Sequence, residues 1–403
     1  MKSSHVCPPG YKQTEVGVIP EDWNLRQLGD VVTFLDGKRR PVKDADRAKM
    51  RGPIPYYGAS GIVDYVNDYL FDEDLILLGE DGENILSRNC RLAFRISGKA
   101  WVNNHAHVLK PNPDISIGFL TDYLESLNYE RFNSGTAQPK LNKQTCFGIP
   151  VALPPTKTEQ EAIAEALSDA DALIESLEQL LAKKRQIKQG AMQELLTGKK
   201  RLPGFCGEWV VKAFGAVAQP RRERIDPRQT GPKEFCIELE HIEQGTGRLG
   251  GHTATSEESS LKSVFYEGDI LFGKLRAYLR KYWLASREGV CSTEIWVLVA
   301  KRSALVPQFL FQLVTMDRFI DAASSAYGTH MPRSDWNVVK KIEVPLPPLL
   351  EQTAIAAILS DMDAEIAALE TKLAKAHQLK QGMMQELLTG RIRLLPSKAM
   401  KES

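Results

Sequence analysis

The chain has 403 residues, of which 52 are Lys or Arg, 51 are Asp or Glu and 43% are hydrophobic. So long a chain exceeds one ordinary core and predicts two or more domains, and its composition excludes a disordered tail. The longest aliphatic run, Leu75–Leu78, is far too short to cross a bilayer. Residues 1–10 are polar and lack the apolar core of a secretory signal, which predicts a cytoplasmic protein.

Six cysteines lie far apart, with no Cys-x-x-Cys pair, which argues against a zinc site and a disulfide framework. The formal net charge of +1 is low for a protein that would neutralise many phosphates alone. Basic clusters do occur, at residues 38–40, 199–201, 221–224 and 274–281. Because such a cluster is more often a solvated surface than a binding site, charge alone does not assign a ligand.

The first predicted domain covers residues 1–152. It opens with Glu21-Asp22-Trp23 and contains strand-like runs at Leu75–Leu78 and Trp101–Leu109, with Gly- and Asn-rich turns between them. Aliphatic and aromatic runs bounded by such turns are typical of strands. We therefore expect a globular domain of mixed α and β structure.

A long helix is predicted next, within residues 153–202. Pro154 and Pro155 exclude helix before it, Thr158-Glu159-Gln160-Glu161 fits a capping box, and Gly198 suits a left-handed helix end. Apolar residues recur at alternating spacings of four and three, which indicates a narrow coiled-coil seam. The seam consists of Ile163, Leu167, Ala170, Ile174, Leu177 and Leu181.

The second predicted domain covers residues 203–345 and weakly repeats the first. It opens with Gly207-Glu208-Trp209 and has strand-like runs at Asp269–Phe272 and Ile295–Val299. Its closing segment, residues 328–333, matches residues 135–140 of the first domain, while the sequences between these ends diverge. Two mixed α and β domains with a similar frame and different loops follow from this comparison.

Residues 346–403 repeat the long helix and add a tail. Between residues 159–202 and 351–394, 29 of 44 positions are identical, and such a repeat decides the architecture. A helix of about 38 residues spans about 57 Å. Two helices of such similar sequence can pair about a pseudo-twofold axis, which makes them antiparallel. Gly390 suits the helix end, and the second seam consists of Ile355, Leu359, Met362, Ile366, Leu369 and Leu373.

The later part of each helix departs from a purely apolar seam. Lys184, Lys188 and Lys380 continue the seam register, so this part needs a further surface, either a partner protein or its own globular domain. Gly190 and Gly382 lie inside the helical pattern, where each costs about 1 kcal/mol relative to alanine. Close approach of a neighbouring backbone and a local bend would both explain them.

The order of these segments resembles the specificity subunits of type I restriction-modification systems. The resemblance covers essentially the whole chain and rests on the duplicated helix, which follows Leu-Pro-Pro, begins near Glu-Gln and ends in Gln-Glu-Leu-Leu-Thr-Gly. Residues 57–61 and 102–107 also look like segments of target recognition domains. The resemblance implies that each domain reads a few base pairs of a bipartite, asymmetric DNA target, and that the antiparallel helices set the spacer between the half-sites.

The same resemblance implies a non-catalytic chain whose partners perform the chemistry. These are two modification subunits, which methylate adenine at N6 with S-adenosylmethionine, and two restriction subunits, which cleave DNA and use ATP and magnesium. The sequence itself has no Gly-x-Gly-x-x-Gly directly after a predicted strand, no phosphate loop and no Asn-Pro-Pro-Tyr tetrad. We therefore expect no catalytic residue, metal or cofactor in this chain.

Two short patterns mimic other sites. Asp30 with Asp36-Gly37-Lys38 has the acidic and lysine spacing of some metal-dependent nucleases, although so short a match arises easily by chance. His105 and His107 alternate along a predicted strand but lack a third metal ligand at recognisable spacing. A DNA-facing or internally hydrogen-bonded pair is the better interpretation of these histidines.

Base-reading candidates are side chains whose donors and acceptors match base-pair edges in the major groove. For each of them a turn hydrogen bond or a surface charge is an equally good interpretation, and Tyr327 and Trp336 also suit a core. The candidates of the first domain are Arg88, Asn89, Asn103, Asn104, His105, Gln138, Lys140 and Asn142. Those of the second are Lys274, Arg276, Tyr278, Arg280, Thr293, Tyr327, His330, Arg333 and Ser334.

Two other functions remain open at this point. A self-contained DNA enzyme would need the missing cofactor motifs, whereas a coiled-coil scaffold protein without DNA readout would need no recognition loops. Neither explains why the domain frames repeat while the loops diverge. We therefore expect two mixed α and β domains, joined by an antiparallel coiled coil with internal pseudo-twofold symmetry, that bind double-stranded DNA.

Overall fold

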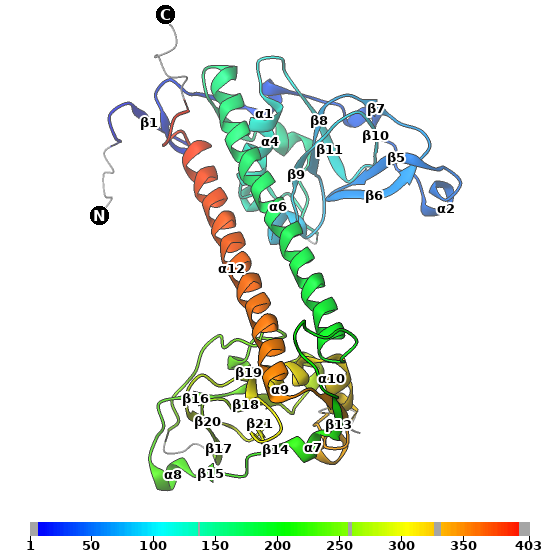
Figure 1. Cartoon of the computed structure of the whole chain (residues 1–403). Helices are drawn as coiled ribbons and strands as arrows, with labels where there is room; N and C mark the ends of the chain where they lie inside the picture. Colours follow the sequence, from blue (N-terminus) through cyan, green and yellow to red (C-terminus); the bar gives the residue numbers. More distant parts are fainter. Residues whose placement is uncertain (1–6, 136–137, 257–259, 326–331, 395–403) are drawn as a thin grey trace, which may run out of the picture. The chain divides into compact units, whose positions relative to one another are not determined.

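The computed structural model describes residues 7–135, 138–256, 260–325 and 332–394. The chain forms two compact units, one of residues 1–178 with 372–403 and the other of residues 179–371. Each unit contains one globular domain and one part of each long helix (Figure 1). The units therefore do not coincide with the predicted segments, because each helix contributes to both. No described helix is both long and apolar enough to cross a membrane.

Each copy of the repeat forms one continuous helix of 39 residues, α6 (Lys157–Leu195) and α12 (Leu349–Leu387). Straight-chain residues and alanine dominate both sequences, and these residues lose little side-chain freedom in a helix. Both helices end before a glycine with a left-handed backbone, Gly198 at φ 73° and Gly390 at φ 72°. The single long helices and their glycine ends confirm the predictions from the sequence.

The start of α6 differs from the expected capping box. Its first residue is Lys157, so Thr158 is already helical. The hydroxyl of Thr156 accepts a hydrogen bond from the backbone N–H of Glu159 at 3.3 Å, which makes Thr156 the capping residue. The prediction was displaced by two positions, because both threonines precede a glutamate and the Pro-Pro sequence does not fix which one comes first in the helix.

The two helices are antiparallel in both units. In the first unit Asp171 of α6 pairs with Lys380 of α12 at 2.6 Å, and Glu178 pairs with His377 at 3.7 Å. Later positions of α6 thus meet earlier positions of α12. The second unit shows the same order in the pairs Lys184–Glu365 and Lys188–Asp363.

The predicted seam is buried or half-buried along both helices. Its lysines are not left without partners, because Lys188 and Lys380 each pair with an aspartate of the other helix, Asp363 and Asp171. These two pairs occupy corresponding positions of the repeat. Polar pairs within an apolar seam favour one register and orientation of the helices over others.

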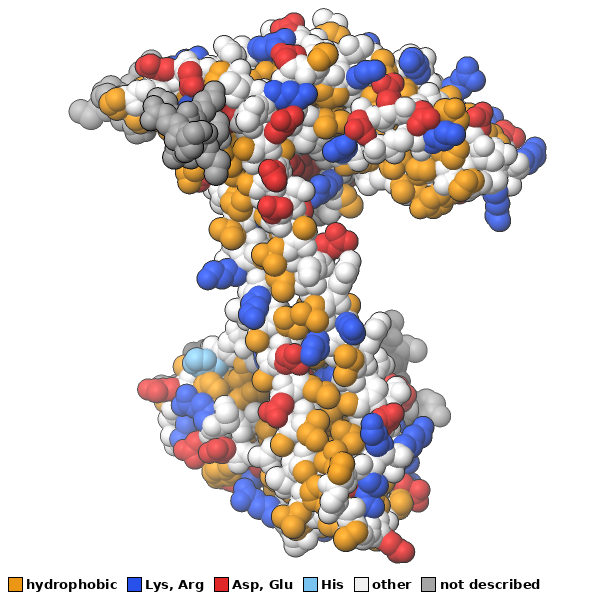
Figure 2. All heavy atoms as spheres, turned by 45° about the horizontal axis from the view of Figure 1, so that its top comes forward, with side chains coloured by type: hydrophobic (Ala, Val, Ile, Leu, Met, Phe, Trp, Pro, Cys, Tyr) orange, Lys and Arg blue, Asp and Glu red, His pale blue; other side chains and the backbone are white. Residues whose placement is uncertain are grey.

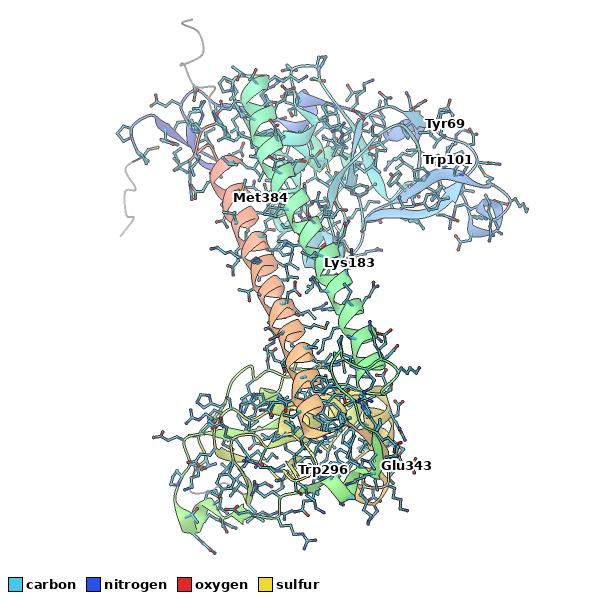
Figure 3. All side chains as sticks on the ribbon, viewed as in Figure 1. Tyr69, Trp101, Lys183, Trp296, Glu343 and Met384 are labelled. Carbon is cyan, nitrogen blue, oxygen red and sulfur yellow. The ribbon has the colours of Figure 1, made fainter. Side chains whose placement is uncertain are left out.

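The final turns of each helix pack against a globular core. Leu195 and Leu196 belong to the core of the second unit, and Leu387 and Leu388 to that of the first. Met384, on the part of α12 beside the first domain (Figure 3), packs against the same core. The sequence predicted that the later part of each helix needs either a partner protein or a globular domain. The chain itself supplies a globular domain for this part of each helix.

The first domain is built from four small sheets, and the buried residues of its second four-stranded sheet form separate clusters from this core. The central sheet has the strand order β4-β11-β8-β9, and a second four-stranded sheet has the order β6-β5-β10-β7. The first comprises Val32–Phe34, Ala106–Pro111, Leu75–Gly79 and Ala93–Ile96; the second Gly61–Val66, Arg51–Gly58, Lys99–Val102 and Phe71–Asp72. The two-stranded sheets are β1 (Tyr11–Thr14) with β2 (Gly17–Pro20), and β3 (Asn24–Gln27) with β12 (Pro150–Leu153). The helices are α1 (Leu28–Val31), α2 (Asp44–Arg47), α3 (Asn84–Ser87), α4 (Ile117–Ser126) and α5 (Lys143–Phe147), with η1 (Asp36–Lys38) and η2 (Glu130–Phe132).

The second domain repeats the frame of the first. Its central sheet has the order β14-β21-β18-β19, and β13 pairs with β22 as β3 pairs with β12. The central strands are Ala218–Pro220, Ile295–Ala300, Ile270–Gly273 and Tyr282–Leu284, and the pair is Val210–Ala213 with Glu343–Leu346. The remaining sheet has the order β15 (Arg224–Ile225), β17 (Lys262–Phe265), β20 (Gly289–Ser292) and β16 (Cys236–Ile237). The helices are α7 (Phe214–Val217), α8 (Pro227–Thr230), α9 (Pro307–Thr315), α10 (Asp317–Ser324) and α11 (Trp336–Val339), with η3 (Leu239–His241) and η4 (Ala277–Leu279).

One predicted strand is divided in the structure. The run Trp101–Leu109 forms the end of β10 and the start of β11, which belong to different sheets. The backbone turns between them, where the Asn103 side chain accepts a hydrogen bond from the N–H of His105 at 2.8 Å. Asparagine side chains stabilise such turns locally, so Asn103-Asn104 within this run was the available signal for the break.

Candidate nucleic-acid interface

Three segments of the first domain meet beside the end of β8 and the start of β11, the two inner strands of its central sheet. We call these segments, residues 80–82, 103–105 and 139–141, the first loop cluster. Backbone N–H groups join them, from Glu80 to the carbonyl of His105 at 2.8 Å and from Leu141 to that of Glu80 at 2.7 Å. Gly82 donates to Pro139 at 3.1 Å. The cluster is therefore held by main-chain bonds, which leave side chains at its surface available for other contacts.

The second domain has a matching cluster, formed by residues 274–280, 292–294 and 332–334. Lys274 donates to the carbonyl of Glu294 at 3.0 Å, and Ser334 donates to that of Lys274 at 2.8 Å. Arg276 donates to Pro332 at 3.0 Å. These three bonds repeat those of the first loop cluster, so the two domains share one backbone frame in these clusters.

The corresponding side chains differ in charge. Glu80 of the first loop cluster corresponds to Lys274 of the second, Gly82 to Arg276, and His105 to Glu294. A common frame that carries different donors and acceptors is what two domains need in order to recognise two different surfaces.

The side chains of three candidates of the first domain make ion pairs or hydrogen bonds within that domain. Arg88 pairs with Glu125 at 2.9 Å, and the buried Asn103 forms the turn described above. Asn142 caps α5, because its side chain accepts from the N–H of Thr145 at 2.8 Å. Their side chains are already bonded within the domain, whatever further contacts they make.

Five candidates of the first domain lie at the surface. Asn89, Asn104 and Gln138 are exposed and make no side-chain hydrogen bond or ion pair with the described residues. His105 bonds to Asp81 at 2.9 Å, and Lys140 pairs loosely with Glu80, at 3.4 Å.

The candidates of the second domain also divide into side chains that are bonded within the domain and side chains that are not. Arg280 pairs with Asp317, and Arg333 pairs with Glu294 at 3.0 Å. The hydroxyl of Ser334 is buried and has no partner among the described residues. By contrast, the side chains of Lys274, Arg276, Tyr278 and Thr293 make no hydrogen bond or ion pair with the described residues, and Tyr327 and His330 lie outside those residues.

A buried histidine supports the first loop cluster from below. The Nδ1 of His107 lies 2.8 Å from an Asp36 carboxylate oxygen, and its Nε2 lies 2.8 Å from the carbonyl oxygen of Leu141. Both neighbours are acceptors, so both ring nitrogens must carry protons. Burial of the ring is the largest single influence and opposes this charge, but the interactions with Asp36, Cys146 and the carbonyl of Leu141 together exceed it and raise the pKa of His107 to about 10. In turn, burial of Asp36 tends to raise the pKa of its carboxyl, but the hydrogen bonds from His107 and from the N–H of Val108, together with the charges of His107 and Arg39, lower this pKa overall.

The patterns that mimic other sites have structural explanations. Asp36 is occupied by His107 and by the backbone N–H of Val108 at 2.9 Å, so it is not free to bind a metal. Across the described ranges, no three Asp, Glu, His or Cys side chains gather in a way that could hold a metal ion. A Gly-x-Gly-x-x-Gly spacing does occur, at residues 245–250, but these residues form a loop that no helix follows.

The sequence did not single out the Glu-Gln pair at the start of each long helix as structural. Glu159, Gln160, Glu351 and Gln352 are all buried. The side-chain oxygen of Gln160 accepts from the N–H of Ser116 at 2.8 Å, and that of Gln352 accepts from Val306 at 2.9 Å. Each glutamine thereby joins its long helix to the segment that leads into a helix of the adjacent domain. The identical Glu-Gln after both Pro-Pro sequences was the available signal.

Surface charge does not by itself mark a binding face. Lys and Arg side chains are interspersed with Asp and Glu over the face shown in Figure 2, in agreement with the net charge of +1. A mixed surface of this kind favours contacts through individual side chains, such as those of the loop clusters, over a broad positive field.

Comparison with known proteins shows which family has this architecture. The family model for the type I restriction modification DNA specificity domain matches residues 20–188 and 240–378. A type I restriction enzyme specificity subunit of Escherichia coli, EcoDI, is 26% identical over 93% of this chain and 90% of its own length. The MjaVIII specificity subunit of Methanocaldococcus jannaschii is 25% identical over 93% of this chain and 94% of its own.

Solved structures show the same fold. The type I restriction-modification S subunit from M. genitalium superposes with a TM-score of 0.62 at 14% identity, over 91% of this chain and 96% of that one. Because the family model matches more than half of the chain, this protein belongs to the type I restriction-modification specificity family. Members of the family are the non-catalytic subunits of their complexes.

Proposed function

We propose that this chain recognises a bipartite, asymmetric DNA target, with one half-site read by each domain. The observation that carries the proposal is the pair of loop clusters, which share three backbone hydrogen bonds but present different side chains. Identical clusters would suit a symmetric target, whereas these suit two unlike half-sites. The side chains best placed to contact DNA are Asn89, Asn104, Gln138, Lys274, Arg276 and Tyr278.

The long helices set the spacer between the half-sites in this proposal. Each is a continuous helix of 39 residues, and the two pair antiparallel in both units. A helix resists changes in length because the backbone groups between its end turns are hydrogen-bonded within it. Helical spacers therefore fix a distance, as protein symmetry does for spaced half-sites elsewhere.

The chain directs catalytic partners to this target. The partners are two modification subunits, which bind S-adenosylmethionine and methylate adenine, and two restriction subunits, which use ATP and magnesium to cleave DNA. Contacts of these partners with DNA would supply positive charge that the net +1 of this chain lacks. Base flipping for methylation belongs to the modification subunit.

The test is a methylome measurement in a host without its own adenine methyltransferases. The chain is expressed with its modification subunit, and N6-methyladenine is mapped by sequencing. We expect a split, asymmetric motif that requires both chains. Exchanging one globular domain for that of a relative should change one half-site only.

A coiled-coil scaffold without DNA readout gives a different result. It would form a stable complex with the modification subunit, and the complex would methylate no defined motif even though the partner's active site is intact. Exchange of a globular domain would then leave the complex and its activity unchanged. Either observation would contradict the proposed function.

A further inference from the structure

Three described residues other than glycine have a positive φ, and all three are arginines: Arg88, Arg276 and Arg280. Such a backbone conformation is uncommon for residues with a side chain and costs free energy relative to glycine. Arg88 and Arg280 have a shared explanation. Each caps the end of a short helix in its domain and pairs with an acid, Glu125 or Asp317. Arg276 has no such pair.

Arg276 corresponds to Gly82, because each donates its backbone N–H to the proline of the matching closing segment. Gly82 also has a positive φ, 109° against 54° at Arg276. The backbone thus has a positive φ at this place in both domains, although the two angles differ. The first domain has glycine here, the usual residue for such a conformation, whereas the second has an arginine at the same place.

Among the described residues, none engages the side chain of Arg276 in a hydrogen bond or ion pair. This side chain is exposed. The nearest acid of the cluster, Glu294, already pairs with Arg333 at 3.0 Å. The backbone of Arg276 is fixed on both sides, by its bond to Pro332 at 3.0 Å and by the bond from Leu279 at 2.9 Å. The guanidinium thus projects from a rigid support, which lowers the entropic cost of binding.

We propose that Arg276 reads a guanine in the half-site contacted by the second domain, with its planar fork on O6 and N7 of the base. This inference rests on the proposed function. Guanine presents two adjacent acceptors in the major groove, and the arginine fork matches them. A phosphate contact needs no fixed position, because a flexible lysine on an ordinary backbone can supply it. The constrained backbone at Arg276 therefore favours base reading.

The test uses Arg276→Gly, which removes the fork and relieves the backbone. The full chain, together with its modification subunit, selects binding sites from a randomised duplex library. The wild type should select a motif with a guanine in one half-site. The variant should lose preference at that position alone, by about 5- to 150-fold, the range for one bidentate contact. Its melting temperature should equal or exceed that of the wild type, because glycine accepts φ 54° without strain.

Arg302→Gly is the control, because Arg302 is exposed and follows β21 at the end opposite Glu294; its motif should be that of the wild type. Arg276→Asn is the second variant, since asparagine also tolerates the left-handed region. Uniform weakening on all sequences with a reduced salt slope would show a phosphate contact and overturn the inference. A relaxed position that is not guanine would overturn it too. If the wild type selects no motif, the proposed function itself fails.

Discussion

Arg201 donates two hydrogen bonds to Glu351, from Nε to Oε1 at 2.6 Å and from Nη2 to Oε2 at 2.7 Å. Glu351 is completely buried at the start of α12, and Arg201 follows the end of α6. In the first unit Arg393 makes the corresponding pair with the buried Glu159. Each unit thus joins the end of one long helix to the start of the other through a paired buried carboxylate.

We expect Arg201→Ala to destabilise the second unit, because it leaves the buried carboxylate of Glu351 without its charged partner. Trp209 still donates to Glu351 at 3.2 Å, which limits the loss. Hydrogen exchange should rise around residues 196–213 and at the start of α12. The control is Lys199→Ala, at an exposed position nearby, where unchanged exchange is expected. Equal protection in both variants would contradict this role of Arg201.

The charged His107 should make the stability of the first unit depend on pH. Its folded pKa of about 10 lies above the ordinary value of 6.5, so the added stability is complete below about pH 6.5. It is lost as the pH rises toward the folded pKa. Urea unfolding at pH 6, 8 and 10 should therefore show a declining stability difference between the wild type and His107→Gln. A constant difference would mean that the ring stays neutral over this pH range and would contradict the prediction.

The contribution of the seam pair Lys188–Asp363 to stability should require opposite charges at the two positions. Lys188→Asp places two carboxylates together in the seam and should destabilise the second unit, whereas adding Asp363→Lys should restore most of the loss. Because both side chains are partly exposed, at 19% and 35%, we expect a coupling energy of about 1 kcal/mol. A double-mutant cycle by denaturant unfolding measures it. The corresponding pair, Asp171–Lys380, serves as an internal control, since its hydrogen exchange should not change.

Gly190 and Gly382 can be replaced without a clash inside the chain. A Cβ added at either position would have no described heavy atom within 4 Å, so close approach of a neighbour in this chain does not explain them. We expect Gly190→Ala and Gly382→Ala each to raise stability by about 1 kcal/mol, which a shift in melting temperature would record. Gly390→Ala is the matched opposite case, because its φ is 72° and the added Cβ would lie 2.5 Å from Pro20. A higher melting temperature for Gly390→Ala, or lower melting temperatures for Gly190→Ala and Gly382→Ala, would contradict the expectation that a side chain is tolerated only at the two helical positions.

The repeat and its long helices could be predicted from the sequence because their signals are local. The seam spacing, the Pro-Pro starts and the glycine ends each involve residues within a few turns of one another. The limits of strands were harder to predict, since the strand-like run Trp101–Leu109 contains a turn at Asn103. An asparagine that turns the chain and one that reads a base look the same in a sequence.

By itself the sequence determined two domains of related frame and a duplicated helix with an apolar seam, because periodicity and identity depend on neighbouring residues or on direct comparison. Only the tertiary structure decided which polar side chains are already bonded and which are free. Arg88 meets Glu125, and His107 meets Asp36, across long separations in the chain. The match between Gly82 and Arg276 likewise depends on backbone bonds that form only when distant loops are brought together by the fold.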